Sequence, residues 1–158
     1  MTLDRYDIQI LQELQKDASL SNQDLADKIG LTPSPCLRRV RHLEEMQLID
    51  SQVTLLNPEK LGLKLSVLIH ISMDKHTPER FEHFEETIDS YPEVMECLLI
   101  TGQSADYMLK VLVPDMMYYQ DFLLNKITRI EGVSGVHSSF VLRQPIRKTA
   151  IPLNHLCK

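Results

Sequence analysis

The sequence lacks the features that mark several classes of protein. Tryptophan is absent, and only 5 glycines and 3 cysteines occur among its 158 residues. No apolar run approaches the roughly 20 residues that span a bilayer, and the polar first residues do not resemble a secretory signal. The scattered cysteines and histidines form neither a C-x-x-C pair nor a metal-ligand spacing, and no glycine-rich phosphate loop is present. We therefore expect no membrane, no metal and no cofactor, and a location in the cytoplasm.

The composition that is present is ordinary, but its charge is unevenly distributed. Hydrophobic residues make up 43% and charged residues 25%, which is typical of a globular protein with one large or two small domains. The formal net charge of −5 argues at first against DNA binding, which works by neutralising phosphates. The window from Lys28 to Leu43, however, holds four cationic residues and no acidic ones.

Three short helices are predicted in the first third of the chain. Apolar residues recur at helical spacing over residues 4–16. A second helix is predicted to start at Ser21 and end at Gly30, because helices often end at a glycine in the left-handed conformation. Thr32 is the expected cap of a third helix, with Pro33 at its first position. Two helices joined by so short a turn are typical of a helix-turn-helix, whose second helix enters the major groove of DNA.

The third helix supplies the side chains that such a function needs. Arginine can bond two acceptors on guanine or hold a phosphate, and a helix N-terminus can bond a phosphate too. The alternative is a plain three-helix bundle with a solvated basic face. Residues 48–56 predict a short strand or wing, and the turn at 57–60 is the expected domain boundary. The candidate DNA-binding residues are Ser21, Asn22, Thr32, Ser34, Pro35, Arg38, Arg39, Arg41 and His42.

The remainder of the chain predicts the order strand, helix, strand, strand, helix, strand. Its strands are expected over 63–73, 94–101, 107–113 and 136–142. The first helix is expected to begin at the Thr-Pro pair 77–78 and to end before Pro92, and the second to begin at the Pro-Asp pair 114–115 and to end at Gly132. This is the ferredoxin-like order, in which two helices cover one face of the sheet. The other face would expose apolar residues that a second sheet could cover, so we expect at least a dimer. These residues are Leu68, Met108, Leu112 and Val141.

The connection between the second and third strands of this half offers groups that suit a free amino acid. Backbone N–H groups near Gly102 could bind a carboxylate, and Asp106 could bind an ammonium group. An ordinary turn uses the same residue types, so that interpretation stays open. Ser138 and Ser139 on the last strand are further candidates, or simply polar positions on a half-exposed strand.

At this point the chain resembles the leucine-responsive and asparagine-synthase-regulator (Lrp/AsnC) family of bacterial transcription factors, the feast/famine regulators. The stretches that carry the resemblance are 3–11, 22–44 and especially 30–40, with the pairs Thr101-Gly102, Asp106-Tyr107 and Gly132-Val133 in the second half. The resemblance implies an α+β protein with a winged helix-turn-helix domain at 1–57. It also implies a ferredoxin-like (RAM/ACT-like) effector and oligomerisation domain at 58–158.

The same resemblance implies partners and an effector. Family members pair through the effector domains and often assemble four dimers into an octamer, with amino acids bound between dimers. Ser139 departs from the family pattern, because that position often holds a larger residue, so the identity of the effector stays open between leucine, methionine and others. The resemblance carries over most directly to Gly102 and Asp106 and less directly to Ser139. Taken with the candidates above, the predicted effector-binding residues are Thr101, Gly102, Gln103, Asp106, Ser138 and Ser139.

The sequence thus predicts a sequence-specific DNA-binding regulator modulated by an amino acid and associated with the bacterial nucleoid. One alternative is an amino-acid sensor that acts on a protein partner. Another is an enzyme with a ferredoxin-like fold, although Cys97 has no evident histidine partner and the Glu85-Glu86 pair reads as a solvated helix face. We therefore expect no catalytic residues.

Overall fold

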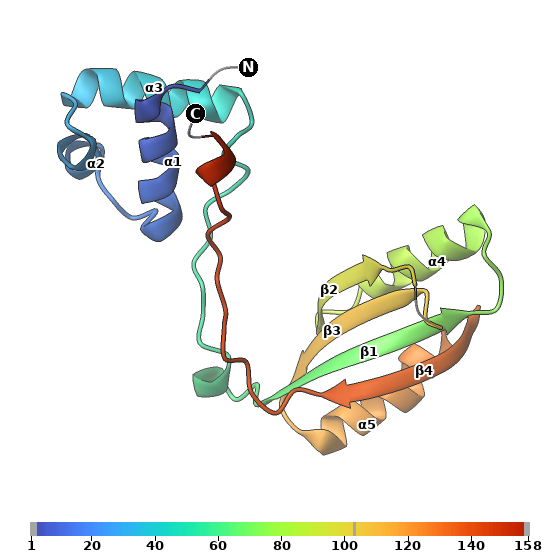
Figure 1. The fold of residues 1–158 in the computed structure, drawn as a ribbon. Coiled ribbons are helices and arrows are strands. Elements are labelled where there is room, and N and C mark those ends of the chain that lie inside the picture. The colour runs from blue at the N-terminus through green and yellow to red at the C-terminus, as the bar shows by residue number, and fades with distance from the viewer. Residues whose placement is uncertain (1–2, 103, 157–158) are drawn as a thin grey trace. The chain divides into compact units, whose positions relative to one another are not determined.

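The computed structural model describes residues 3–102 and 104–156 and divides into two units (Figure 1). The N-terminal unit comprises Met1–Leu55 together with Pro145–Lys158, and the sheet unit comprises Leu56–Gln144. By its contacts, the C-terminal segment therefore belongs with the N-terminal unit. The expected division into 1–57 and 58–158 does not include this return of the chain.

The N-terminal unit is built from three helices whose ends follow local signals. These are α1 (Arg5–Lys16), α2 (Asn22–Ile29) and α3 (Pro33–Glu45). The side chain of Ser21 accepts a hydrogen bond at the start of α2, and Gly30 ends that helix with φ of 74°, a conformation that glycine adopts without strain. Thr32 takes the extended backbone of an N-cap, but its side chain makes no capping hydrogen bond. Both helix boundaries of the turn are thus where the sequence predicts them.

The helices of the N-terminal unit enclose a small core. Ile10 on α1, Leu25 and Ala26 on α2, and Cys36 and Leu43 on α3 are all nearly inaccessible to solvent. The expected strand or wing after α3 is wrong for the described residues, because no strand is formed anywhere in 46–64. Residues 50–57 are exposed and have no neighbouring strand among residues 3–102 and 104–156 to pair with, so the backbone gains no ladder of hydrogen bonds.

The C-terminal segment is attached to α1 by a side chain that mimics a peptide group. The Ile151 N–H donates to Oε1 of Gln15 at 2.8 Å, and Nε2 of Gln15 donates to the Ile151 carbonyl at 3.2 Å. Leu153 is buried, and the short helix η3 (Asn154–Leu156) follows it. Burial of Leu153 and the paired bonds of Gln15 explain why this segment belongs with the N-terminal unit.

The sheet unit has the predicted ferredoxin-like order. Its four strands are arranged β2-β3-β1-β4, all neighbours are antiparallel, and α4 and α5 cover one face (Figure 1). The elements are η1 (Glu59–Leu61), β1 (Leu65–Met73), α4 (Pro78–Asp89), β2 (Val94–Leu99), β3 (Tyr107–Val113), α5 (Met116–Asn125), η2 (Ile127–Arg129) and β4 (Val133–Phe140).

Alternation along the strands separates the two faces of the sheet. On β3, every second residue from Tyr107 to Val113 is buried against the helices, and Met108, Lys110 and Leu112 take the opposite face. Leu68 shares that open face, because it lies opposite Lys110 in the ladder. The open apolar face is therefore as expected, with its members half-buried in this chain.

Three elements of the sheet unit have boundaries that differ from the predicted ones. Helix α5 ends at Asn125, where the chain tightens into η2, instead of continuing to Gly132. Strand β4 covers 133–140, three residues earlier than expected, so Leu142 lies outside the sheet and is 97% exposed. Strand β2 also ends at Leu99, before the expected limit at Thr101.

Candidate DNA-binding surface and effector region

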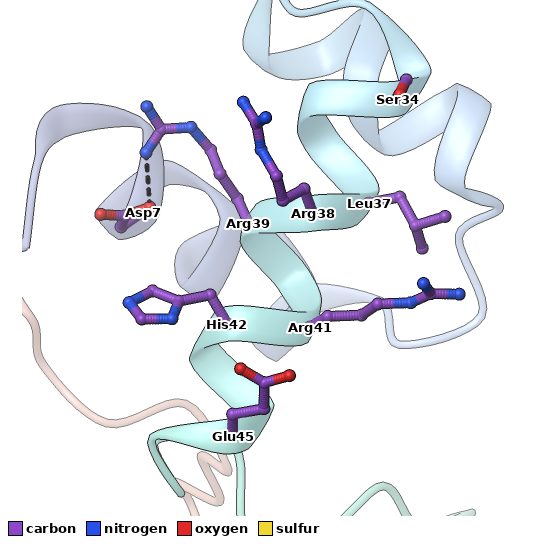
Figure 2. Close-up of a pocket in the computed structure, with 8 residues that line it drawn as sticks. All are labelled: Asp7, Ser34, Leu37, Arg38, Arg39, Arg41, His42 and Glu45. Carbon is purple, nitrogen blue, oxygen red and sulfur yellow. Dashed lines mark hydrogen bonds and ion pairs between the residues drawn. The ribbon is translucent and has the colours of Figure 1, made fainter.

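The exposed side of α3 forms an open groove of about 730 Å³ within the N-terminal unit (Figure 2). The packing of α3 explains which side chains reach it. Cys36 and Leu43 are seven residues apart and face the core, so the residues between them at other helical angles face outward. The residues that line the groove are Asp7, Ser34, Leu37, Arg38, Arg39, Arg41, His42 and Glu45.

Five of the nine predicted DNA-binding residues meet in this groove. Figure 2 shows Arg39 turned toward Asp7, while Arg41 and Leu37 leave α3 on the other side. Leu37 is not among the predicted DNA-binding residues, yet it lines the groove and is 39% exposed. An exposed apolar side chain on a recognition helix can contact the methyl group of thymine. The signal that could have identified Leu37 is its position one turn after Ser34, on the same face as Arg41.

Arg39 differs from the other arginines because two carboxylates already bind it. Its Nη1 lies 2.7 Å from Oδ2 of Asp4 and 2.7 Å from Oδ1 of Asp7, and its guanidinium carbon lies 5.4 Å from the centre of the Tyr6 ring. Hydrogen bonds to the carboxylates of Asp7 and Asp4 raise the pKa of Arg39. The groove therefore contains one arginine whose charge is satisfied within the protein.

The remaining predicted DNA-binding residues lie at the helix ends and serve the turn itself. The Ser21 hydroxyl caps α2. The side-chain amide of Asn22 donates to the Pro33 carbonyl at 2.8 Å, which ties the start of α2 to the start of α3. Thr32 is exposed and Pro35 is half-buried. These four residues, Ser21, Asn22, Thr32 and Pro35, do not line the groove.

In the sheet unit, the connection after β2 is held against the end of β1. The Asp106 carboxylate accepts a hydrogen bond from the Met73 N–H at 2.7 Å, and its other oxygen lies 2.6 Å from Nε2 of His76. Thr101 and Gly102 are exposed, and Gly102 has φ of 89°. Each oxygen of Asp106 is thus already engaged once, and an ammonium group would have to share or replace these contacts. Gln103 lies outside the described residues.

The two candidate serines on β4 point to opposite faces of the sheet, because they are consecutive in one strand. Ser138 is opposite Ile69, and its hydroxyl forms a hydrogen bond with the Tyr119 hydroxyl on α5. Ser139 is opposite Leu68 on the open face. The structure therefore does not bring both serines to one site within a single chain.

A second cavity of about 460 Å³ lies between α4 and the edge strand β2. It is lined by Glu85, Tyr107 and Cys97 among others, and none of the predicted effector residues line it. Burial, and then the nearby Glu85 carboxylate, raise the pKa of Cys97 to about 11, which leaves its thiol protonated and a poor nucleophile at neutral pH. This cavity does not have the features of a thiol-based catalytic site.

Over residues 3–102 and 104–156, no cluster of three His, Cys, Asp or Glu side chains could hold a metal ion. No helix among those same residues is long and apolar enough to cross a membrane.

A helix-turn-helix with an exposed cationic groove, joined to a ferredoxin-like domain, defines a DNA-binding regulator of two parts. Residues 3–50 match the model of a winged helix-turn-helix DNA-binding domain, and residues 66–151 match that of the Lrp/AsnC ligand-binding domain. The chain belongs to the Lrp/AsnC family of transcriptional regulators. It is not an enzyme, since its relatives are regulators of transcription.

Three relatives illustrate how far the similarity extends. The chain is 45% identical over 151 residues to the Bkd operon transcriptional regulator of Pseudomonas aeruginosa, covering 96% of this chain and 98% of that protein. It is 40% identical over 142 residues to the leucine-responsive regulatory protein of Escherichia coli, covering 90% and 86% respectively. A crystal structure of a Neisseria meningitidis transcriptional regulator in complex with L-Met is 39% identical, covers 98% of this chain and 99% of that one, and has a TM-score of 0.94.

Proposed function

We propose that α3 is the recognition helix and lies in the major groove of DNA, with Ser34, Arg38 and Arg41 as its polar contacts. The observation that carries this proposal is the groove along α3, where these side chains are exposed together and no ion pair holds Arg38 or Arg41 among the described residues. The N-terminus of α3 carries no acidic residue in its first turn, so it can approach a phosphate. His42 and Leu37 complete the surface.

The test is the salt dependence of DNA binding by single alanine variants. A phosphate contact contributes about 0.9 to the slope of log affinity against log salt, whereas a base contact changes the preference for one sequence. We expect Arg38→Ala and Arg41→Ala each to lower the slope by about 1 or to relax specificity. Arg129→Ala, which removes an equal charge from the sheet unit, serves as the control. Wild-type affinity, slope and specificity in both variants would refute the assignment of α3.

We also propose that the effector is a free amino acid bound at the connection Thr101, Gly102 and Asp106. The support is a family domain described as ligand-binding over 66–151 and the exposed loop that carries these residues. Leucine and methionine are the first candidates, because relatives at 40% and 39% identity are named for leucine response and for an L-Met complex. We include Ser139 in this proposal because it lies on the open face of the sheet, which a paired subunit would cover. We include Ser138 because its hydroxyl bonds Tyr119 on α5.

The effector proposal is tested by calorimetric titration of the full chain with leucine, methionine and a panel of other amino acids. Asp106→Asn keeps an acceptor for the Met73 N–H but removes the charge that an ammonium group needs. A charge-assisted hydrogen bond is worth about 1.5–3 kcal/mol, so we expect affinity to fall tenfold or more. Asp74→Asn, at the same end of β1, is the matched control. Unchanged affinity in Asp106→Asn would place the ammonium group elsewhere.

We further propose that two chains pair through the open face of the sheet and that four such dimers form an octamer. Leu68, Met108 and Leu112 are half-buried apolar side chains on that face, which a second sheet would cover. Sedimentation at micromolar concentration should give a dimer or a multiple of it, and Leu112→Glu should lower the mass. A monomeric wild-type chain would contradict this proposal.

A regulator of this kind would act on the nucleoid in the bacterial cytoplasm. Titration of the protein against its own upstream DNA, with and without each amino acid, tests this role as a whole. A DNA complex whose affinity changes with one amino acid supports it. Amino-acid binding without any DNA complex would instead support a sensor that acts on a protein partner.

A further inference from the structure

The two acidic residues at the start of α1 have contacts that extend beyond the helix. Asp4 and Asp7 form a reciprocal capping box, in which Oδ1 of Asp4 accepts from the Asp7 N–H at 3.0 Å and Oδ2 of Asp7 accepts from the Asp4 N–H at 3.1 Å. Each carboxylate thus uses one oxygen to cap α1. The other oxygen of each lies 2.7 Å from the same nitrogen of Arg39 on α3.

This arrangement occupies donors of Arg39 that a phosphate could otherwise use. Two anionic oxygens, one from each carboxylate, lie against one guanidinium nitrogen, and carboxylates and phosphates compete for the same charged N–H donors. The backbone N–H of Asp7, and then the Arg39 guanidinium, hold the pKa of Asp4 below its usual value, so Asp4 is ionised at neutral pH. The group of Asp4, Asp7 and Arg39 carries a formal net charge of −1. Such a group does not attract a DNA phosphate, although Arg39 lines the groove beside Arg38 and Arg41.

We propose that Asp4 and Asp7 act as an internal substitute for DNA phosphate that withholds Arg39 from the backbone of DNA. Arg39 is then a positioning residue, which fixes α3 against α1, and the acidic pair sets the ratio of specific to non-specific DNA binding. This inference rests on the proposed role of α3 as the recognition helix. It assigns Arg39 a role different from the direct DNA contact that the sequence predicts.

Neutralising the pair should release the arginine. Asparagine caps helices as well as aspartate does, so Asp4→Asn with Asp7→Asn removes both charges and keeps an N-cap acceptor on α1. The freed Arg39 can then contact a phosphate. We expect non-specific affinity to rise about eightfold at 0.1 M salt and the salt slope to steepen by about 0.9, because one more counterion is released. The ratio of operator to non-operator affinity should fall.

Three further variants separate this cause from others. Glu44→Gln with Asp50→Asn removes the same charge from exposed positions of the N-terminal unit that do not line the groove, and should leave the salt slope unchanged. Adding Arg39→Gln to the Asp4 and Asp7 variant should abolish the gain in slope. Arg39→Gln alone should lower thermal stability but keep the wild-type slope, which distinguishes a positioning residue from a phosphate contact.

The results of these experiments distinguish a failure of this inference from a failure of the proposed function. A wild-type slope in the Asp4 and Asp7 variant, alongside reduced slopes in Arg38→Ala and Arg41→Ala, would overturn this inference alone. A reduced slope in Arg39→Gln would also overturn it. Wild-type slopes and specificity in every variant, including Arg38→Ala and Arg41→Ala, would overturn the role of α3 itself. If the double variant unfolds, Asp7→Asn alone carries the test, with a smaller steepening expected.

Discussion

At Gly30, in the turn between α2 and α3, the effect of a substitution on stability depends on the backbone conformation alone. Gly30 has φ of 74°, and a Cβ added there would meet no atom within 4 Å. Replacement by alanine therefore introduces no steric clash with the rest of the fold. The cost is the left-handed backbone itself, about 1–2 kcal/mol for a residue with a Cβ. Alanine also restricts the unfolded chain, which offsets about 0.4–1 kcal/mol.

We therefore expect Gly30→Ala to lower the free energy of unfolding of the N-terminal unit by about 1 kcal/mol. Gly30→Asn should cost less, because asparagine tolerates the left-handed conformation better than alanine. Gly62 is the matched control in the sheet unit, since it has φ of 85° and the same open surroundings. Gly62→Ala should have a similar cost, confined to that unit.

Hydrogen exchange of the full chain measures both effects in one experiment, because peptides from α2 and α3 report on one unit and peptides from β1 on the other. Urea unfolding followed by circular dichroism gives the total change. A loss in Gly30→Ala well above 2 kcal/mol, or a variant with asparagine less stable than the one with alanine, would refute the reasoning from backbone strain alone. DNA affinity should change less than twofold where the unit stays folded.

Three further predictions concern the sheet unit. Gly132→Ala should destabilise the sheet unit more than Gly30→Ala destabilises the N-terminal unit. Its φ is 95°, and the new Cβ would also lie 2.6 Å from Cδ of Arg80, which pairs with Glu131 and Asp74. Urea unfolding of the two variants gives the comparison. Glu93→Gln should cost about 1–2 kcal/mol in the same assay, less than for a fully buried ion pair, because its partner Lys126 is 38% exposed. Burial raises the pKa of Glu93, but hydrogen bonds from Lys126 and Tyr118 outweigh it and the pKa is lowered below 4.5. The stabilisation is therefore present above pH 4.5 and lost as the pH falls through the folded-state pKa, so the difference between wild type and Glu93→Gln should shrink on acidification, and a constant difference would contradict this.

The features that sequence reasoning predicted are those set by nearby residues. The start of α2 at Ser21 and its end at Gly30 depend on one hydroxyl and one missing Cβ, which are visible in the sequence. Strand β3 was predicted at 107–113, where it is found, because its period of two reflects one buried and one open face. Helix α5 was overextended because η2 continues the apolar pattern through Ile127 after the α-helical backbone has ended.

Features that depend on distant residues were not predictable in the same way. Gln15 and Ile151 are 136 positions apart, and no pattern at either position indicates that a side-chain amide will bond a backbone peptide group. The expected wing failed for a related reason. A strand needs a partner, and the extended residues after α3 have a strand-like composition without an adjacent strand in the described chain.

The candidate DNA-binding surface shows how such distant contacts change the interpretation of charge. The acid-free window contains four cations, yet Lys28 lies 3.7 Å from Glu13, and Arg39 is bound by Asp4 and Asp7, all residues of α1 or its cap. Packing of α1 against the other helices thus leaves Arg38 and Arg41 as the cations of the window that have no ion pair among the described residues, and these are the two proposed to contact phosphates. Two such contacts correspond to a salt slope of about −1.8 for each bound subunit, which is small beside that of a repressor with many phosphate contacts. The proposed pairing through the apolar open face of the sheet would place more than one such surface on the same DNA, and avidity would then raise the overall affinity.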